Sequence, residues 1–188
     1  MTVAGLVLAA GGGRRMGRPK ALVVSDGGSW LGRAVAALEA GGCHPVVVAL
    51  GAQASDARPL VPPGVHVVVV TGWERGVAES LRQGLDAVEV ASRDAEGVIV
   101  TLVDLPGLRA EAIARVVGND VGDRRSTLRQ ARYAGRPGHP VLLGREHWGP
   151  LRDALRADVG ARDYLAAHGA VAVDCTDLGG GDDVDRRE

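Results

Sequence analysis

The sequence has one lysine, two cysteines and no apolar run long enough to cross a bilayer. Of the 22 lysines and arginines among its 188 residues, only Lys20 is a lysine, and the formal net charge is −1. This balance gives no electrostatic case for nucleic-acid binding. No basic region precedes the first apolar stretch, so we expect no signal peptide, and the short apolar runs exclude a membrane span. We expect a cytoplasmic protein with no nucleic-acid or membrane partner.

The two cysteines, Cys43 and Cys175, lack the spacing of a zinc or redox motif. We expect both to be buried thiols. Hydrophobic residues make up 46% of the chain and are spread throughout it. A chain of this length can build one domain with a proper core, so we expect residues 1–188 to form a single domain.

Short apolar runs alternate with helical patterns, which favours βαβ units on a parallel sheet. Residues 3–9 are apolar almost without interruption, as is typical of a strand covered on both faces. Ser29 is expected to cap a helix that ends near Gly41. Further strands are expected at 46–50, 65–70, 98–103, 127–133, 141–143 and 171–174, with helices around 77–88, 113–117, 145–155 and 160–168 and a turn at 135–140. The expected fold class is α/β: a mostly parallel, Rossmann-like sheet with helices on both faces.

The loop after the first predicted strand combines glycine with positive charge. Three consecutive glycines let a backbone approach an anion and turn its N–H groups inward. Ligands of open α/β sheets bind beyond the carboxyl ends of the strands, where this loop lies. The combination suits a triphosphate, whereas the alternative is a surface loop whose charges face water. The residues concerned are Gly11, Gly12, Gly13, Arg14, Arg15, Arg18 and Lys20.

Two better-known glycine motifs do not fit this loop. A P-loop needs Lys and then Ser or Thr directly after its last glycine, but Gly17 is followed by Arg18. The dinucleotide fingerprint needs a third glycine where Met16 stands. Lysine offers a compact point charge that suits a crowded phosphate site. The alternative is that Lys20 has no special role and is a lysine by chance in a chain that otherwise uses arginine.

The motifs Leu8-Ala9-Ala10-Gly11, Arg15-Met16-Gly17 and Pro19-Lys20 resemble the signature of the MobA-like NTP transferases. Within that group they are most similar to the molybdenum cofactor cytidylyltransferases. The resemblance covers nearly the whole chain. It extends through Trp73, Gly76, Ser80-Leu81, Gly84-Leu85, Asp104-Leu105-Pro106, Gly138-His139-Pro140 and the DVGAR segment at 158–162. It implies a fold of the nucleotidyltransferase type and transfer of a nucleotidyl group from a nucleoside triphosphate.

Nucleotidyl transfer needs no protein nucleophile, because the enzyme neutralises charge and holds an in-line geometry. Asp104 ends a predicted buried strand, where a carboxylate ligand for Mg²⁺ is expected. The alternative role for Asp104 is a turn or cap before Pro106. The resemblance makes Asp104 the principal metal ligand and suggests Asp185 as a second one, although terminal acids are more often just solvated.

Lys20 and Arg15 are expected to contact the phosphates and stabilise the leaving pyrophosphate. Ser80 would reach the base or ribose, unless it bonds its own helix backbone. The expected catalytic residues are thus Arg15, Lys20 and Asp104. The expected nucleotide-binding residues are Leu8, Ala9, Ala10, Gly11, Gly12, Gly13, Arg15, Lys20 and Ser80.

The resemblance places His139, Asp158 and Arg162 on the acceptor side, as substrate-binding residues. Taken alone, His139 would be a hydrogen-bonded structural residue. Asp158 and Arg162 would be an ion pair one helical turn apart.

The reaction expected from the resemblance is transfer of CMP from CTP to the molybdopterin-bound molybdenum cofactor. CTP is favoured because the guanylyl branch usually has glycine at the position of Ala10. One alternative keeps the reaction but uses another phosphorylated acceptor, such as a sugar phosphate or a phospholactate. Another is a non-catalytic chaperone for the cofactor, with a molybdoenzyme as its partner. Some relatives carry the name of oxidoreductases of nicotine breakdown, but no dinucleotide fingerprint supports redox chemistry here.

Overall fold

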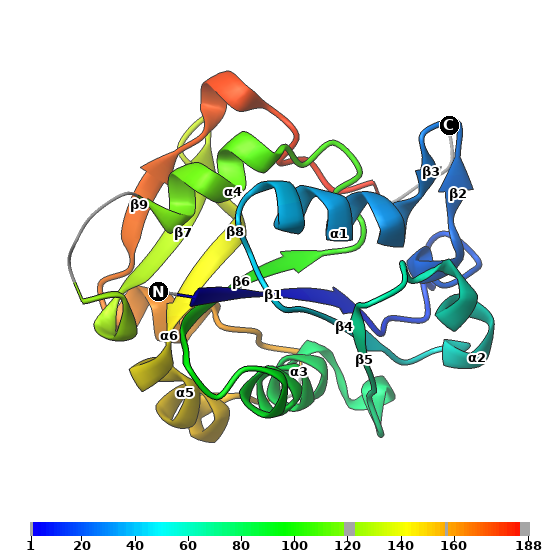
Figure 1. The fold of residues 1–188 in the computed structure, drawn as a ribbon, viewed down its shortest axis with the longest axis horizontal. Helices are drawn as coiled ribbons and strands as arrows, with labels where there is room; N and C mark the ends of the chain where they lie inside the picture. The colour runs from blue at the N-terminus through cyan, green and yellow to red at the C-terminus, as the bar shows by residue number, and fades with distance from the viewer. Residues whose placement is uncertain (1, 119–122, 157, 185–188) are drawn as a thin grey trace.

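The computed structural model describes residues 2–118, 123–156 and 158–184, so Asp185 lies outside the described residues. Its centre is a seven-stranded sheet in the order β5-β4-β1-β6-β8-β7-β9 (Figure 1). Among the described strands of this sheet, only β8 runs antiparallel to both of its neighbours, and the other pairs are parallel. The sheet confirms the predicted α/β class. Its strands are β1 (Thr2–Ala9), β4 (Val46–Leu50), β5 (His66–Val69), β6 (Ala95–Leu102), β7 (Leu128–Tyr133), β8 (Arg136–Gly144) and β9 (Val171–Asp174).

Helices cover both faces of this sheet, and buried apolar side chains form one cluster on each face (Figure 1). One face carries α1 (Trp30–Ala40) and α4 (Ala110–Val117). The other carries α3 (Val77–Ala91), α5 (Trp148–Ala154) and α6 (Arg162–Ala167). Two small elements had no sequence-based prediction: α2 (Ala54–Ala57) and a hairpin of β2 (Val24–Ser25) and β3 (Gly28–Ser29).

Strand β1 lies between β4 and β6 and is buried from Val3 to Ala9, as its unbroken apolar sequence predicts. Helix α3 packs closely against it. A Cβ atom at Gly84 would lie 2.9 Å from both Leu6 Cδ atoms, so a larger residue there would force the Leu6 side chain to move. The close packing brings the first turns of α3 to the carboxyl end of β1.

The predicted start of α1 is confirmed. The Ser29 side chain accepts a hydrogen bond from Gly32 N at 3.0 Å, which satisfies one of the free N–H groups of the first turn. The helix ends at Ala40 and Gly41 caps it. Both cysteines are buried free thiols, as expected, and burial raises the pKa of Cys43 to about 12. No helix in the described ranges is both long and apolar enough to span a membrane.

The turn expected at 135–140 is wrong, because Arg136–Gly144 is strand β8. The actual turn is confined to Ala134 and Gly135, whose φ values of 49° and 78° suit a tight two-residue hairpin. Prolines are tolerated in β8 because its pairing with β7 shifts register between Gln130 and Arg132. His139 therefore lies on a strand and not in a loop.

Candidate active site

Two adjoining cavities lie where the parallel strands end. The first cavity, of about 420 Å³, is bounded by the loop after β1, by Lys20 and Asp104, and by the segment around Trp73. The second cavity, of about 580 Å³, includes His139 and Arg162 in its wall. The two cavities share part of their lining, namely Leu8, Val77, Leu102 and Asp158. Ligands in the two cavities would therefore be neighbours.

The loop after β1 folds back on itself at Gly13. This residue has a φ of 62°, and a Cβ atom there would lie 1.8 Å from the carbonyl oxygen of Arg18, so only glycine fits. Met16 N donates to Gly13 O at 2.9 Å and closes the turn. A Cβ atom at Gly11 would meet nothing within 4 Å, although Gly11 lines the first cavity. The backbone at Gly11 is thus open to an anion that enters the cavity.

The ring of Trp73 forms one wall of the first cavity and packs on two glycines. Ring atoms lie 3.2 Å from the Cβ position of Gly12 and 2.8 Å from that of Gly51. A larger side chain at either glycine would collide with the ring. Trp73 thereby joins the loops that follow β1, β4 and β5, and the neighbouring Glu74 also lines the cavity.

Lys20 and Asp104 form an ion pair at the first cavity. Lys20 Nζ lies 2.7 Å from Asp104 Oδ2, and the two side chains are 15% and 16% exposed. Lys20 begins a 3-10 turn after Pro19, and Asp104 follows the end of β6. Val184 N donates to the carbonyl oxygen of Asp104 at 3.0 Å, which fixes this backbone. The motif with Lys20 and the motif with Asp104, which were predicted separately, therefore meet at one cavity.

The second oxygen of Asp104 fits a hard divalent cation. Oδ1 is buried and, within the described part of the chain, has no hydrogen-bond partner. Such an oxygen is costly unless a ligand uses it, and oxygen is the donor that Mg²⁺ prefers. No group of three or more His, Cys, Asp or Glu that could hold a metal occurs among the described residues. Mg²⁺ commonly takes one or two carboxylates together with waters and phosphate oxygens.

The second cavity combines apolar walls with a few polar groups. Burial lowers the pKa of His139 to about 4, against the opposing charge of Asp104, so its ring is neutral near pH 7. The His139 carbonyl accepts a hydrogen bond from Tyr133 Oη at 3.0 Å. Asp158 and Arg162 are both exposed, and no ion pair in the described structure joins them. The remaining lining includes Leu81, Val100, Leu105, Val141, Leu143, Leu165, Gln130, Asp163 and Asp183.

Every predicted site residue that the structure describes lines one of the two cavities, while its role stays a prediction. Ser80 is 6% exposed on the first turns of α3, which gives its hydroxyl a place in the cavity wall. Sequence reasoning missed Glu74, whose only signal is its position beside Trp73. The first cavity has Leu8, Ala9, Ala10, Gly11, Gly12, Gly13, Arg15, Lys20, Ser80 and Asp104, and the second has His139, Asp158 and Arg162.

The sequence matches known proteins over most of its length. Residues 5–172 match the MobA-like NTP transferase domain. Nicotine blue oxidoreductase of Paenarthrobacter nicotinovorans is 33% identical, over 99% of this chain and 93% of that protein. Molybdenum cofactor guanylyltransferase of Rhodobacter capsulatus is 30% identical, over 92% and 84% of the two chains.

Solved structures agree with this match. Rv0371c of Mycobacterium tuberculosis H37Rv superposes with a TM-score of 0.80 at 31% identity, over 99% of this chain and 94% of that one. A structure of Rv0371c in complex with manganese superposes with a TM-score of 0.73 at 27% identity, over 93% and 87% of the two chains.

Proposed function

The chain belongs to the MobA-like NTP transferase family, and we propose that it transfers CMP from CTP to the molybdenum cofactor with release of pyrophosphate. The observation that carries the proposal is the convergence of the glycine loop, Lys20 and Asp104 on one cavity that shares its wall with a second. A donor and an acceptor can therefore be bound side by side. The relatives named molybdenum cofactor guanylyltransferase support this acceptor.

In this proposal the first cavity holds the triphosphate. Backbone N–H groups of the glycine loop and the charges of Arg15 and Lys20 surround the phosphates. Lys20 is held at the cavity by Asp104 and needs no large movement to reach an anion there. These positive groups offset the charge that develops on the leaving pyrophosphate.

Asp104 would hold the divalent cation, which we propose to be Mg²⁺. Its Oδ1, which has no hydrogen-bond partner among the described residues, and the manganese in the Rv0371c complex both support a metal-binding role. A bound cation would neutralise phosphate charge and polarise the phosphoryl oxygen.

The second cavity would hold the acceptor so that its phosphate faces the α-phosphorus. The acceptor oxygen attacks that phosphorus, the bond to the β-phosphate oxygen breaks, and pyrophosphate leaves with the electron pair. The chain contributes position and charge and no nucleophile. The neutral ring of His139 can donate one hydrogen bond and accept another, and Arg162 adds a positive charge.

The choice of CTP rests on Ala10. This residue lines the first cavity and is 3% exposed, and its methyl carbon lies 2.7 Å from the Cβ position of Gly51. The guanylyl branch of the family usually has glycine here, and this difference favours CTP in the proposal. The guanylyltransferase relatives make GTP the rival donor.

Pyrophosphate release should be measured with each of the four nucleoside triphosphates and Mg²⁺, with and without molybdenum cofactor. We expect CTP to give the fastest, cofactor-dependent release, and Ala10→Gly to shift the preference toward GTP. Preference for GTP in the unmodified chain would overturn the choice of base. Release with a sugar phosphate or phospholactate in place of the cofactor would overturn the choice of acceptor. Cofactor binding without turnover, unchanged by Asp104→Ala, would indicate a chaperone.

A redox function is the rival that the similarity to nicotine blue oxidoreductase raises. Met16 stands where a dinucleotide fingerprint requires glycine, so this loop is not a nicotinamide dinucleotide site of that type. Oxidation of NADH or NADPH by the purified chain, measured beside pyrophosphate release, would contradict the proposed transfer reaction if it were the faster of the two.

A further inference from the structure

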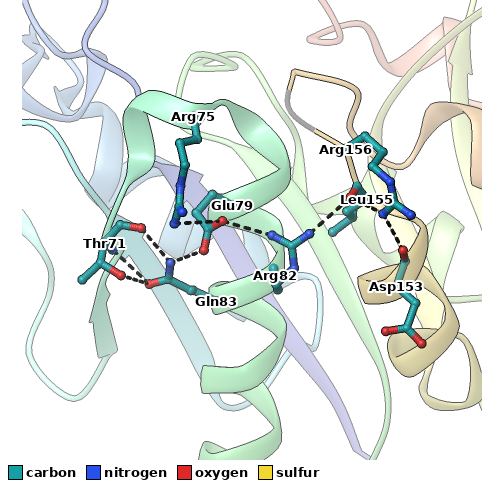
Figure 2. Close-up of polar contacts among 8 residues, drawn as sticks. All are labelled: Thr71, Arg75, Glu79, Arg82, Gln83, Asp153, Leu155 and Arg156. Atoms are coloured by element: carbon teal, nitrogen blue, oxygen red, sulfur yellow. Dashed lines mark hydrogen bonds and ion pairs between the residues drawn. The ribbon is translucent and has the colours of Figure 1, made fainter.

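Helix α3 carries polar side chains next to the face that lines the cavities. Val77 lines both cavities, Ser80 the first and Leu81 the second. On the neighbouring face, Glu79, Arg82 and Gln83 form a connected set of hydrogen bonds and ion pairs, which we call the α3 network (Figure 2). Figure 2 shows that this network reaches chain segments on both sides of the helix.

Gln83 holds the segment that enters the first cavity. Thr71 N donates to Gln83 Oε1 at 3.0 Å, and Gln83 Nε2 donates to Thr71 O at 2.8 Å (Figure 2). Both backbone groups of Thr71 are thus fixed by one amide. Residues 72–76 follow directly and supply Trp73 and Glu74 to the first cavity. The position of this wall therefore depends on Gln83.

Arg82 holds the segment that enters the second cavity. Its Nη2 donates to the carbonyl oxygen of Leu155 at 3.2 Å, while its Nη1 donates to Glu79 Oε2 at 3.0 Å (Figure 2). Leu155 lies at the end of α5, shortly before Asp158 and Arg162. One guanidinium therefore connects α3 to the start of the second cavity wall.

Glu79 connects Gln83 to Arg82. Its Oε1 accepts from Gln83 Nε2 at 2.5 Å, and its Oε2 accepts from Arg82 and lies 3.3 Å from Arg75 Nη2. The Glu79 side chain is 15% exposed. A glutamine in its place would offer one amide oxygen, with no charge, to two donors, so the hydrogen bonds that orient the Gln83 amide and the Arg82 guanidinium would no longer both form.

We infer that the residues of the α3 network, Glu79, Arg82 and Gln83, are positioning residues. They hold one wall of the first (donor) cavity and one wall of the second (acceptor) cavity in place against α3. They line neither cavity, and in this inference they act through the segments that do. In-line transfer is sensitive to such positioning, because a displacement of about 1 Å costs on the order of 100-fold in rate. The inference rests on the proposed transfer reaction for its kinetic consequence, but the physical link can be measured without it.

The test compares Glu79→Gln with Glu89→Gln. Glu89 is also on α3 and also bridges two arginines, because its carboxylate lies 3.3 Å from Arg145 Nη2 and 2.7 Å from Arg152 Nη2. Arg145 belongs to the turn before α5, and Arg152 belongs to α5 itself. We expect Glu79→Gln to lower kcat for CTP-dependent pyrophosphate release by roughly tenfold or more, with Glu89→Gln close to wild type. Amide hydrogen exchange should become faster at 71–76 and 158–162 only in Glu79→Gln.

Two further variants test the role of Gln83 at the first cavity and the role of Arg82 at the second cavity separately. Gln83→Ala should raise the KM for nucleotide and leave the KM for acceptor near its normal value. Arg82→Lys keeps the charge beside Glu79 but cannot donate to both Glu79 and Leu155 with one rigid fork, so it should raise the KM for acceptor.

Unchanged exchange at both segments in Glu79→Gln would overturn the inference, whatever the protein catalyses. Equal kinetic losses in Glu79→Gln and Glu89→Gln would overturn it as well, because a loss of general stability would then suffice. A wild-type chain that transfers no nucleotide would overturn the proposed function, and the exchange measurement would still decide the inference.

Discussion

Lys20 and Asp104 stand 84 positions apart in the sequence, yet Nζ of one lies 2.7 Å from Oδ2 of the other. The carboxylate thus holds a cationic side chain with one oxygen and keeps the other buried and unpartnered among the described residues. A triphosphate that arrives with its cation would use both groups at once. In the proposed reaction the ion pair would therefore be preorganised, with Lys20 turned toward the phosphates and Asp104 toward the cation.

Replacement of Lys20 by alanine should lower kcat/KM for CTP-dependent pyrophosphate release on the order of 100- to 1000-fold, because a charge at the leaving group is lost. Lys20→Arg should recover only part of this, since a planar guanidinium does not replace a compact ammonium. Arg115→Ala is the control, because Arg115 pairs with Asp177 away from both cavities. Similar losses in Lys20→Ala and Arg115→Ala would contradict the prediction.

Gly13→Ala should destabilise the protein by more than about 1 kcal/mol, because alanine resists a left-handed φ and its Cβ would collide with the Arg18 carbonyl. Gly11→Ala meets no atom within 4 Å and should leave the melting temperature unchanged while weakening nucleotide binding. Thermal melts and calorimetric titration with CTP measure the two effects. A Gly13→Ala protein with wild-type stability would show that the loop does not fold as described.

Nucleotide binding should change the fluorescence of Trp73. The other two tryptophans, Trp30 and Trp148, are 6% and 1% exposed and line neither cavity, so they should not respond. Titration with CTP and Mg²⁺ should give a saturable change that disappears in Trp73→Phe. Persistence of the full signal in that variant would place the nucleotide elsewhere.

Acid should destabilise the folded chain through His139. Burial holds its folded pKa at about 4, below the ordinary value of 6.5. Its contribution to stability is therefore complete above pH 6.5 and is lost as the pH falls toward 4. Between pH 7 and pH 5 this amounts to about 2 kcal/mol. Denaturant unfolding at both pH values should show a smaller difference for His139→Gln, and equal differences would refute the assignment.

The sequence predicted those parts of the fold that depend on the side chains of neighbouring residues. Ser29 has a side chain suited to capping, and it caps α1. The prediction failed at 135–140, where the turn-rich composition of Gly135 to Pro140 indicated a turn. The chain in fact turns at Ala134, an alanine with left-handed φ that carries no local signal. The pairing of β7 with β8 and a hydrogen bond from Ala134 N to Thr176 Oγ1 hold that conformation, and both form only in the folded chain.

The same distinction applies to the candidate site. Lys20 and Asp104 each belonged to a recognisable motif, so both were predicted, although their direct contact was not. Glu79 and Gln83 were not predicted, because polar residues beside an apolar helical stripe normally face water. Thr71, which Gln83 binds, and Leu155, which Arg82 binds, approach α3 only in the folded chain.

The reversed direction of β8 has a consequence for how this site could diverge. Val141 on β8 pairs with Val100 on β6, so the beginning of β8, with His139, lies near the carboxyl end of β6. Much of the wall of the first cavity, the proposed donor side, belongs to loops, which tolerate insertions. Part of the second cavity, the proposed acceptor side, belongs to strand β8, which is hydrogen-bonded to β6 and β7. New acceptors should therefore arise by exchange of single side chains along β8 and seldom by a change in its length.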